Sequence, residues 1–207
     1  MQKSGPLNRA VSTLAVLTSL TACSPVGERT QLSVGYYSLS GRNFSEIDRQ
    51  IGVHGPTVGG FGKALAATTV RMIPDFRFAD TPSGCRVQNA SVKVQARVTL
   101  PRLASSTTLK HDLSKAWSNL EQYARLHESV HVAIADRHAL NAEKTLMALP
   151  PERNCSEMRD AAQLTYRRLL AEHEKEQLQF DESEKSRIAE LVEKTRHAGI
   201  NQPAEEQ

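Results

Sequence analysis

Two hydrophobic periodicities divide the chain. In the first part, apolar and polar residues alternate, which is typical of strands with one buried and one solvent-facing side. The alternation is clearest where the apolar positions are Val92, Val94, Ala96, Val98 and Leu100. Strands are therefore predicted over residues 32–39, 64–78 and 84–100. We expect Pro101 to end the third strand, because proline cannot donate a hydrogen bond to a sheet.

After Lys110 the period becomes that of a helix. Residues recur at alternating spacings of four and three, and the stripe consists of Leu113, Trp117, Leu120, Ala124, His127, His131, Ile134 and His138. This stripe predicts a long helix that starts near Asp112 and ends at Pro150-Pro151. A second long helix is predicted to start near Ser156. Because the connection is short, the two helices should form an antiparallel hairpin.

The fold class that follows is α+β. A small antiparallel sheet is expected to pack on the long two-helix hairpin, which carries most of the remaining apolar residues. A short helix should lie between the first two strands, because Asn43 and Glu46 form a capping-box arrangement at its start. The whole arrangement is small enough to form one domain.

The first residues have the pattern of an export signal. Lys3 and Arg9 are followed by an apolar stretch over residues 11–20, which is too short to cross a bilayer. It ends in Leu20-Thr21-Ala22-Cys23, which resembles the lipobox of bacterial lipoproteins and implies a lipid anchor on Cys23. The alternative is an ordinary signal peptide with a nearby cysteine. The predicted organisation is a signal peptide (1–22), a tether (23–31), a single domain (32–195) and a polar tail (196–207).

The cysteine count agrees with export. The chain has three cysteines, and an odd number in an exported protein needs a reason. If Cys23 carries lipid, Cys85 and Cys155 remain as a pair, and we expect them to form a disulfide in an oxidising compartment. The alternative is a pair of buried free thiols.

Composition and charge narrow the possible functions. Of the 207 residues 39% are hydrophobic and 24% are charged, which is a globular balance. The net charge of +3 is small and spread along the chain. We therefore expect neither a nucleic-acid partner nor a basic patch for a membrane surface.

The candidate chemistry lies on the first long helix, in the segment His127-Glu128-Ser129-Val130-His131. Two histidines four residues apart project from the same side of a helix and can bind one ion, and the glutamate beside the first can accept a proton from metal-activated water. This is the HExxH arrangement of zinc metalloproteases. The alternative is a pair of core histidines satisfied by hydrogen bonds. His138 cannot share the ion, because it lies about 10 Å beyond His131 along the helix.

A catalytic zinc ion (Zn²⁺) usually has three protein ligands. With the turn of the hairpin near residues 152–153, the stretch opposite the motif is about residues 174–179. His173 is our first choice for the third ligand, because it continues the apolar stripe of the second helix, and Glu176 and Glu172 follow. The alternative is that these three side chains form a solvated charged face.

The sequence also resembles a bacterial family of predicted secreted zinc-dependent proteases, described as a domain of unknown function, over about residues 35–181. The likeness includes Tyr37–Gly41 with Glu46 and Gly55-Pro56, Cys85–Pro101, the motif helix Trp117–Ala135, and Cys155. The family tends to close with Tyr-Asp, a threonine and a His-Gly pair. Phe180-Asp181 fits this ending, but Ser186-Arg187 stands where the His-Gly pair is expected.

The resemblance implies a zinc metallopeptidase anchored in the cell envelope, with a peptide or protein as substrate. The edge of the strand that ends at Leu100-Pro101 is expected to bind an extended substrate by strand addition. The alternative function is a non-catalytic lipoprotein, a binding or scaffolding module that has kept the fold, with or without the metal.

Overall fold

The computed structural model of the protein describes residues 29–59 and 62–200. The predicted export signal and Cys23 lie outside the described residues, as does the tail from residue 201 onward. Among the described residues, no helix combines the length and the apolar character that crossing a membrane requires.

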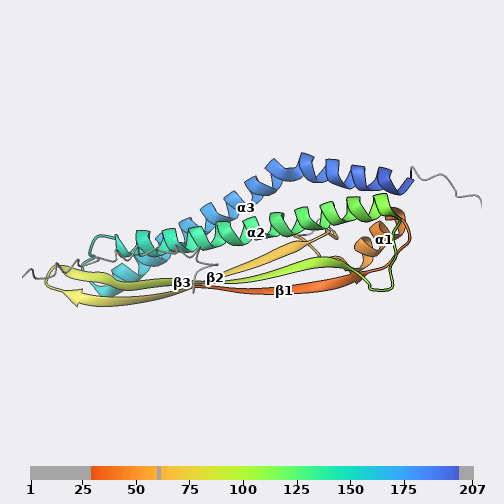
Figure 1. Cartoon of the computed structure of the whole chain (residues 1–207). Coiled ribbons are helices and arrows are strands. Elements are labelled where there is room, and N and C mark those ends of the chain that lie inside the picture. Colours follow the sequence, from red (N-terminus) through yellow and green to blue (C-terminus); the bar gives the residue numbers. More distant parts are fainter. Residues whose placement is uncertain (1–28, 60–61, 201–207) are drawn as a thin grey trace, which may run out of the picture.

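A three-stranded sheet forms one layer, and the helices lie along one of its faces (Figure 1). The strands are β1 (Thr30–Leu39), β2 (Ala67–Thr81) and β3 (Gly84–Leu103), in the order β1-β3-β2. The α+β class is confirmed. The expectation that every pairing is antiparallel is wrong, because β3 pairs antiparallel with β2 but parallel with β1. After the tight hairpin, β3 runs back between the other two strands and so takes the direction of β1.

The central position of β3 follows from its alternation. From Ala90 to Leu100 its even-numbered residues are almost fully buried, and they include the five apolar residues that the sequence pattern singled out. Pro101 does not end the strand, which continues to Leu103. The proline is tolerated because β2 begins opposite Thr99, so that beyond this point β3 has a neighbour only on the β1 side.

Three helices complete the element list of the described chain: α1 (Phe44–His54), α2 (His111–Met147) and α3 (Cys155–Ile200). The predicted cap of α1 is present, since the Asn43 side chain accepts a hydrogen bond from the backbone N–H of Glu46 at 3.0 Å. α3 continues to Ile200, past residue 195, where the sequence predicted the domain to end. Thr195 is buried near the end of this helix, where Gly199 approaches Phe44 of α1.

Small side chains let α2 pack closely on β3 and α3. The buried face of α2 towards its C-terminal end contains Ala135, Ala139 and Ala142, which share a core cluster with Val92 and Val94 of β3. From the start of α3 this cluster receives Met158, Ala162, Tyr166 and Leu169. The other end of α2 belongs to a separate cluster, in which Leu113, Trp117 and Leu120 contact β1 and α1. α2 therefore spans both ends of the core.

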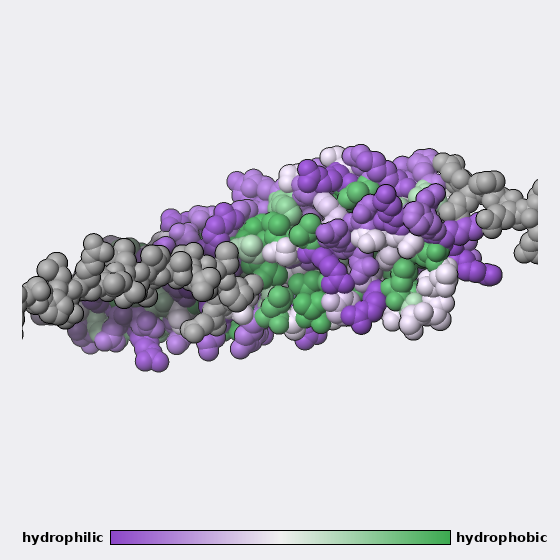
Figure 2. All heavy atoms as spheres, viewed as in Figure 1, coloured by the Kyte–Doolittle hydropathy of each residue, from purple (hydrophilic) through white to green (hydrophobic). Residues whose placement is uncertain are grey.

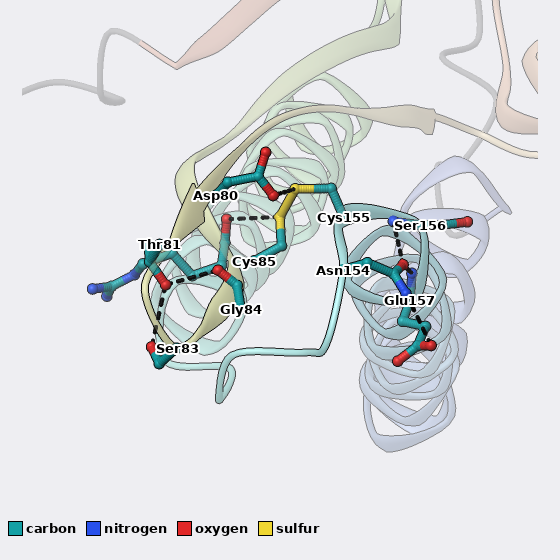
Figure 3. The surroundings of a disulfide bond; sticks show 10 residues. Asp80, Thr81, Ser83, Gly84, Cys85, Asn154, Cys155, Ser156 and Glu157 are labelled. Atoms are coloured by element: carbon teal, nitrogen blue, oxygen red, sulfur yellow. Dashed lines mark hydrogen bonds between the residues drawn. A yellow bond between two sulfur atoms is a disulfide. The ribbon is translucent and has the colours of Figure 1, made fainter.

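A disulfide between Cys85 and Cys155 joins β3 to the start of α3, with the two Cα atoms 5.0 Å apart (Figure 3). The expected bridge is confirmed. A backbone bridge accompanies it, because Cys85 and Glu152 exchange N–H···O hydrogen bonds of 2.7 and 2.9 Å. Gly84 has φ of 117°, and a Cβ there would meet the Glu152 carbonyl oxygen at 2.1 Å, so this position requires glycine.

The free edge of β1 is unusually apolar. The ten residues of this edge strand contain no charged residue and no proline, and Leu32, Val34 and Tyr36 are exposed. In the view of Figures 1 and 2, β1 and α2 lie towards the viewer. Figure 2 shows apolar side chains gathered over the middle of this side of the molecule. The usual protections of an edge strand, charge and proline, are absent from β1.

The disulfide should stabilise the fold by constraining the unfolded chain. A bridge closing a 70-residue separation contributes about 4 kcal/mol on the chain-entropy estimate. We expect the double substitution Cys85→Ala and Cys155→Ala to lower the free energy of unfolding by about 2–5 kcal/mol in urea denaturation. Reduction of the wild-type protein should have the same effect, while a reductant should leave the double variant unchanged. An unshifted urea midpoint in the double variant would contradict this assignment.

Candidate metal centre

His127 and His131 lie one turn apart on α2, and both rings face α3. Their Nε2 atoms are 3.1 Å apart, and their side chains are 10% and 13% exposed. Asp181 of α3 meets them, with its Oδ1 3.2 Å from Nε2 of His127 and 3.0 Å from Nε2 of His131. Three atoms of the kinds that bind metals therefore converge from two helices.

The spacing of these three atoms suits a tetrahedral ion. Zinc binds histidine nitrogen at about 2.0–2.1 Å, which places neighbouring ligand atoms of a tetrahedron about 3.3 Å apart. The observed separations of 3.0–3.2 Å are close to that edge length. Three protein ligands would leave a fourth position on a bound ion for water or substrate, as in catalytic rather than structural zinc sites. The Asp181 side chain is 50% exposed, so the group is open to solvent on the α3 side.

Gln177 of α3 determines how the His131 ring is oriented. The Gln177 Oε1 atom lies 2.6 Å from Nδ1 of His131, and its Nε2 donates to the backbone carbonyl of His131 at 3.1 Å and lies 2.8 Å from Nε2 of His173. Because both hydrogens of the amide point to acceptors, its oxygen faces the ring and accepts from Nδ1–H. The His131 Nε2 lone pair is then directed at the other two atoms of the centre.

Aromatic residues enclose the remaining sides of the histidine pair. The Phe180 ring stacks on His127 with centroids 4.7 Å apart and meets His131 edge-on at 5.1 Å. One turn before His127, the Tyr123 hydroxyl donates to Glu184, and burial together with this hydrogen bond raises the pKa of Tyr123 to about 12. These rings limit the access of water to the two imidazoles.

Burial lowers the pKa of His127, and the neighbouring His131 ring acts in the same direction. Asp181 opposes this shift but does not reverse it. The lowered pKa favours the neutral form of His127, which is the form of histidine that binds metals. Its Nδ1 atom is buried and has no hydrogen-bond partner among the described residues. His127 thus lacks the kind of support that Gln177 provides to His131.

Glu128 faces the sheet rather than α3. Its side chain is buried, at 5% exposure, and its Oε2 accepts a hydrogen bond of 2.7 Å from the Thr68 hydroxyl on β2. Burial raises the pKa of the Glu128 carboxyl, and the Thr68 hydrogen bond acts in the opposite direction. A carboxyl group with a raised pKa suits proton transfer near neutral pH. The sequence pattern contained no signal for the contact with Thr68, which lies 60 residues away.

The structure places the three candidates for a third ligand away from the histidine pair. His173 is buried beside His138, with ring centroids 5.4 Å apart, and reaches His131 only through Gln177. Glu176 binds His138 at 2.8 Å and pairs with Arg137. Glu172 is exposed, with Arg168 3.8 Å away. None of the three belongs to the convergent group of His127, His131 and Asp181.

Asp181 occupies the third position because of the offset between the two helices. α2 ends at Met147 and α3 begins at Cys155, so that seven residues connect them. This places Gln177 opposite His131, inside the predicted stretch 174–179, and Asp181 one turn further along α3. The signal for Asp181 was the Phe180-Asp181 pair in the family resemblance, rather than the apolar stripe of α3.

A second convergent group, formed by Asp80, Cys85 and Cys155, does not resemble a metal site. The two sulfurs are joined in the disulfide and are not available as thiolates. Figure 3 shows the Asp80 side chain next to the bridge, with Oδ1 3.3 Å from the Cys155 sulfur.

Comparison with known families finds a match. The family model of a bacterial protein of unknown function (DUF922) matches residues 34–187, and the chain belongs to this family. The matched region includes the whole convergent group as well as Gln177 and the disulfide. No curated protein and no solved structure matches the chain.

Proposed function

We propose that this protein is a zinc-dependent peptidase, with the ion held by His127, His131 and Asp181. The convergence of two imidazole nitrogens and one carboxylate oxygen within 3.2 Å of one another is the observation that carries the proposal. Zinc at this position would polarise a peptide carbonyl and lower the pKa of water to about 7. Gln177 and Phe180 keep the two rings oriented for this role.

In this proposal Glu128 is the proton acceptor. Its place beside the first histidine, with a pKa raised by burial, suits a group that takes a proton from water and returns it to the departing amine. The Thr68 hydroxyl holds one carboxylate oxygen and leaves the other for the proton transfer. Thr68 is therefore a positioning residue for Glu128.

The strand expected to bind the substrate requires a correction. The strand ending at Leu100-Pro101 is β3, which lies between β1 and β2 and does not offer the expected open edge. β2 is an edge strand, and it carries Thr68, whose hydroxyl donates to the Glu128 carboxylate. We propose that an extended peptide pairs with this edge, since main-chain hydrogen bonds to a strand hold a substrate without regard to its sequence.

We also propose that the protein is exported and anchored to a membrane of the cell envelope through a lipid on Cys23. The lipobox-like segment before Cys23 supports this, and so does the disulfide, which belongs in an oxidising compartment.

A non-catalytic binding module is the second candidate. The observation that favours it is the burial of Glu128, whose carboxylate is 5% exposed and already engaged by Thr68. In that case the metal would serve the fold, and the open side at Asp181 would be a binding surface.

The first test is metal content. Elemental analysis of the purified protein should show about one zinc per chain, and the substitutions His127→Ala and Asp181→Asn should each abolish it. The matched controls His111→Ala and Asp160→Asn change exposed residues of the same two helices and should keep the metal. A wild-type protein that carries no zinc under any loading condition would overturn the proposal. The contacts among His127, His131 and Asp181 would then be hydrogen bonds rather than the arrangement of a metal site.

The second test concerns Glu128. The variant Glu128→Gln should retain zinc but lose peptide hydrolysis by about 10²–10⁴-fold, because the amide cannot accept the proton. Cleavage is measured on a mixed peptide library by mass spectrometry. The control is Glu172→Gln, which changes an exposed residue and should retain full activity. Equal cleavage by Glu128→Gln and wild type would refute the mechanism. A zinc-loaded wild type that cleaves no peptide would favour the binding module.

The third test concerns the support of His131. Replacing Gln177 by Leu removes the acceptor of the Nδ1–H and should lower zinc affinity by about 10–100-fold. Gln179→Leu is a matched control, since Gln179 is exposed two residues further along α3. Competition with a chromophoric chelator measures both variants. If the two retain equal affinity, Gln177 does not position the ligand.

A further inference from the structure

The face of the sheet opposite the helices carries a concentration of basic residues. In β2 and β3, the residues that alternate with the buried ones point to this face, and Figure 1 shows all three helices on the other side. Its exposed cations are Arg71, Arg77, Arg86, Lys93 and Arg97, and its one exposed carboxylate is Asp75. Five cations and one carboxylate give this single face a net charge of +4, which exceeds the +3 of the entire chain. The expectation that the protein has no basic patch is therefore wrong, because strand pairing gathers cations that are spread along the sequence.

These five cations are not neutralised by the fold. None of them forms an ion pair with another described residue, whereas the helices carry many pairs, such as Arg125 with Glu121 and Lys194 with Glu190. Arg86 and Arg97 are both on β3, about 36 Å apart at 3.3 Å per residue. The positive potential thus extends along an open, elongated layer rather than surrounding a single pocket.

The shape and composition of the face favour a flat anionic partner. Its other side chains are mainly small or amide-bearing, namely Thr69, Ser91, Gln95 and Thr99 with Ser33 and Gln31 of β1, and none of the exposed positions carries an aromatic ring. Single-stranded nucleic acids are usually bound by aromatic rings on which bases stack. A bilayer with anionic headgroups requires only cations within a Debye length of about 8–10 Å.

The position of the expected lipid anchor is compatible with such a surface. Six residues lie between Cys23 and Thr30, where β1 begins, and the seven residue-to-residue steps that join these two positions span at most about 25 Å. A lipid on Cys23 would keep this sheet close to the bilayer.

We propose that the basic face of the sheet, formed by Arg71, Arg77, Arg86, Lys93 and Arg97, binds the anionic headgroups of a phospholipid bilayer. This contact orients the molecule so that the helices and the metal centre face away from the membrane. The proposal concerns a surface separate from the metal centre and does not depend on peptidase activity.

The experiment measures binding of the full chain to vesicles. All variants carry Cys23→Ala, so that no acyl chain contributes to binding. All of them also keep the apolar stretch 11–20, so that its contribution is the same in every comparison. Vesicles containing phosphatidylglycerol are compared with pure phosphatidylcholine at increasing salt. The variant Arg71→Gln, Lys93→Gln, Arg97→Gln should lower the partition coefficient on anionic vesicles by about 100-fold, or roughly 5-fold for each cation removed.

The matched control is Lys115→Gln, Arg167→Gln, Lys175→Gln, which removes the same charge from exposed positions on the helices. It should bind anionic vesicles like the parent. Equal losses in the two triple variants would overturn the proposal, because net charge alone would then explain binding, and so would an absence of preference for phosphatidylglycerol. Binding to single-stranded DNA as tight as binding to the vesicles, and lost in the same variant, would identify a general polyanion surface instead.

Two further measurements separate folding and metal binding from this result. The single variant Lys93→Gln should lose about 5-fold on its own, and thermal unfolding should show that each variant keeps the parent stability. Zinc content should be the same in the parent and in both triple variants. A fall in zinc content confined to the variant of the basic face would show that the face and the metal centre are not independent.

Discussion

The packing of α2 against two neighbours at once is the constraint on which the rest of the structure depends. Consecutive residues of a helix are rotated by about 100°, so that His127 and Glu128 have to face different partners. The sheet receives Glu128 and Val132, and α3 receives His127 and His131. The two candidate ligands and the Glu128 carboxylate are therefore supported by separate contacts, the histidines by α3 and the carboxylate by Thr68 of β2.

Much of the fold could be predicted from the sequence, because the two periodicities are strong and the core follows them. The buried parity of β3 and the boundaries of α2 agree with the patterns within a few residues. Strand order could not be predicted in the same way. Alternation shows which side of a strand is buried but not which neighbours it has, and so the parallel pairing of β1 with β3 and the continuation through Pro101 depend on tertiary context.

Within the candidate site, the relation between residues close together in the sequence could be predicted, and the contacts between distant residues could not. The spacing of His127 and His131 is a property of one helix, and the structure brings their Nε2 atoms to 3.1 Å from each other. The position of Asp181 depends on the offset of α3 along α2. A different offset would place a residue one helical turn away opposite the histidines. The basic face has the same origin, since cations that are evenly spread along the chain gather on one side through the register of β2 and β3.

The disulfide between Cys85 and Cys155 also has a consequence for the folding of a newly made chain. Asp181 follows Cys155 on the same helix, so the bond that fastens the start of α3 also helps to hold the carboxylate against the histidines. In a reducing environment that bond is missing, and α3 is held by its contacts with α2, while the backbone hydrogen bonds between Cys85 and Glu152 hold the segment before it. Formation of the convergent group of His127, His131 and Asp181 would therefore depend in part on the redox conditions of the compartment in which the chain folds.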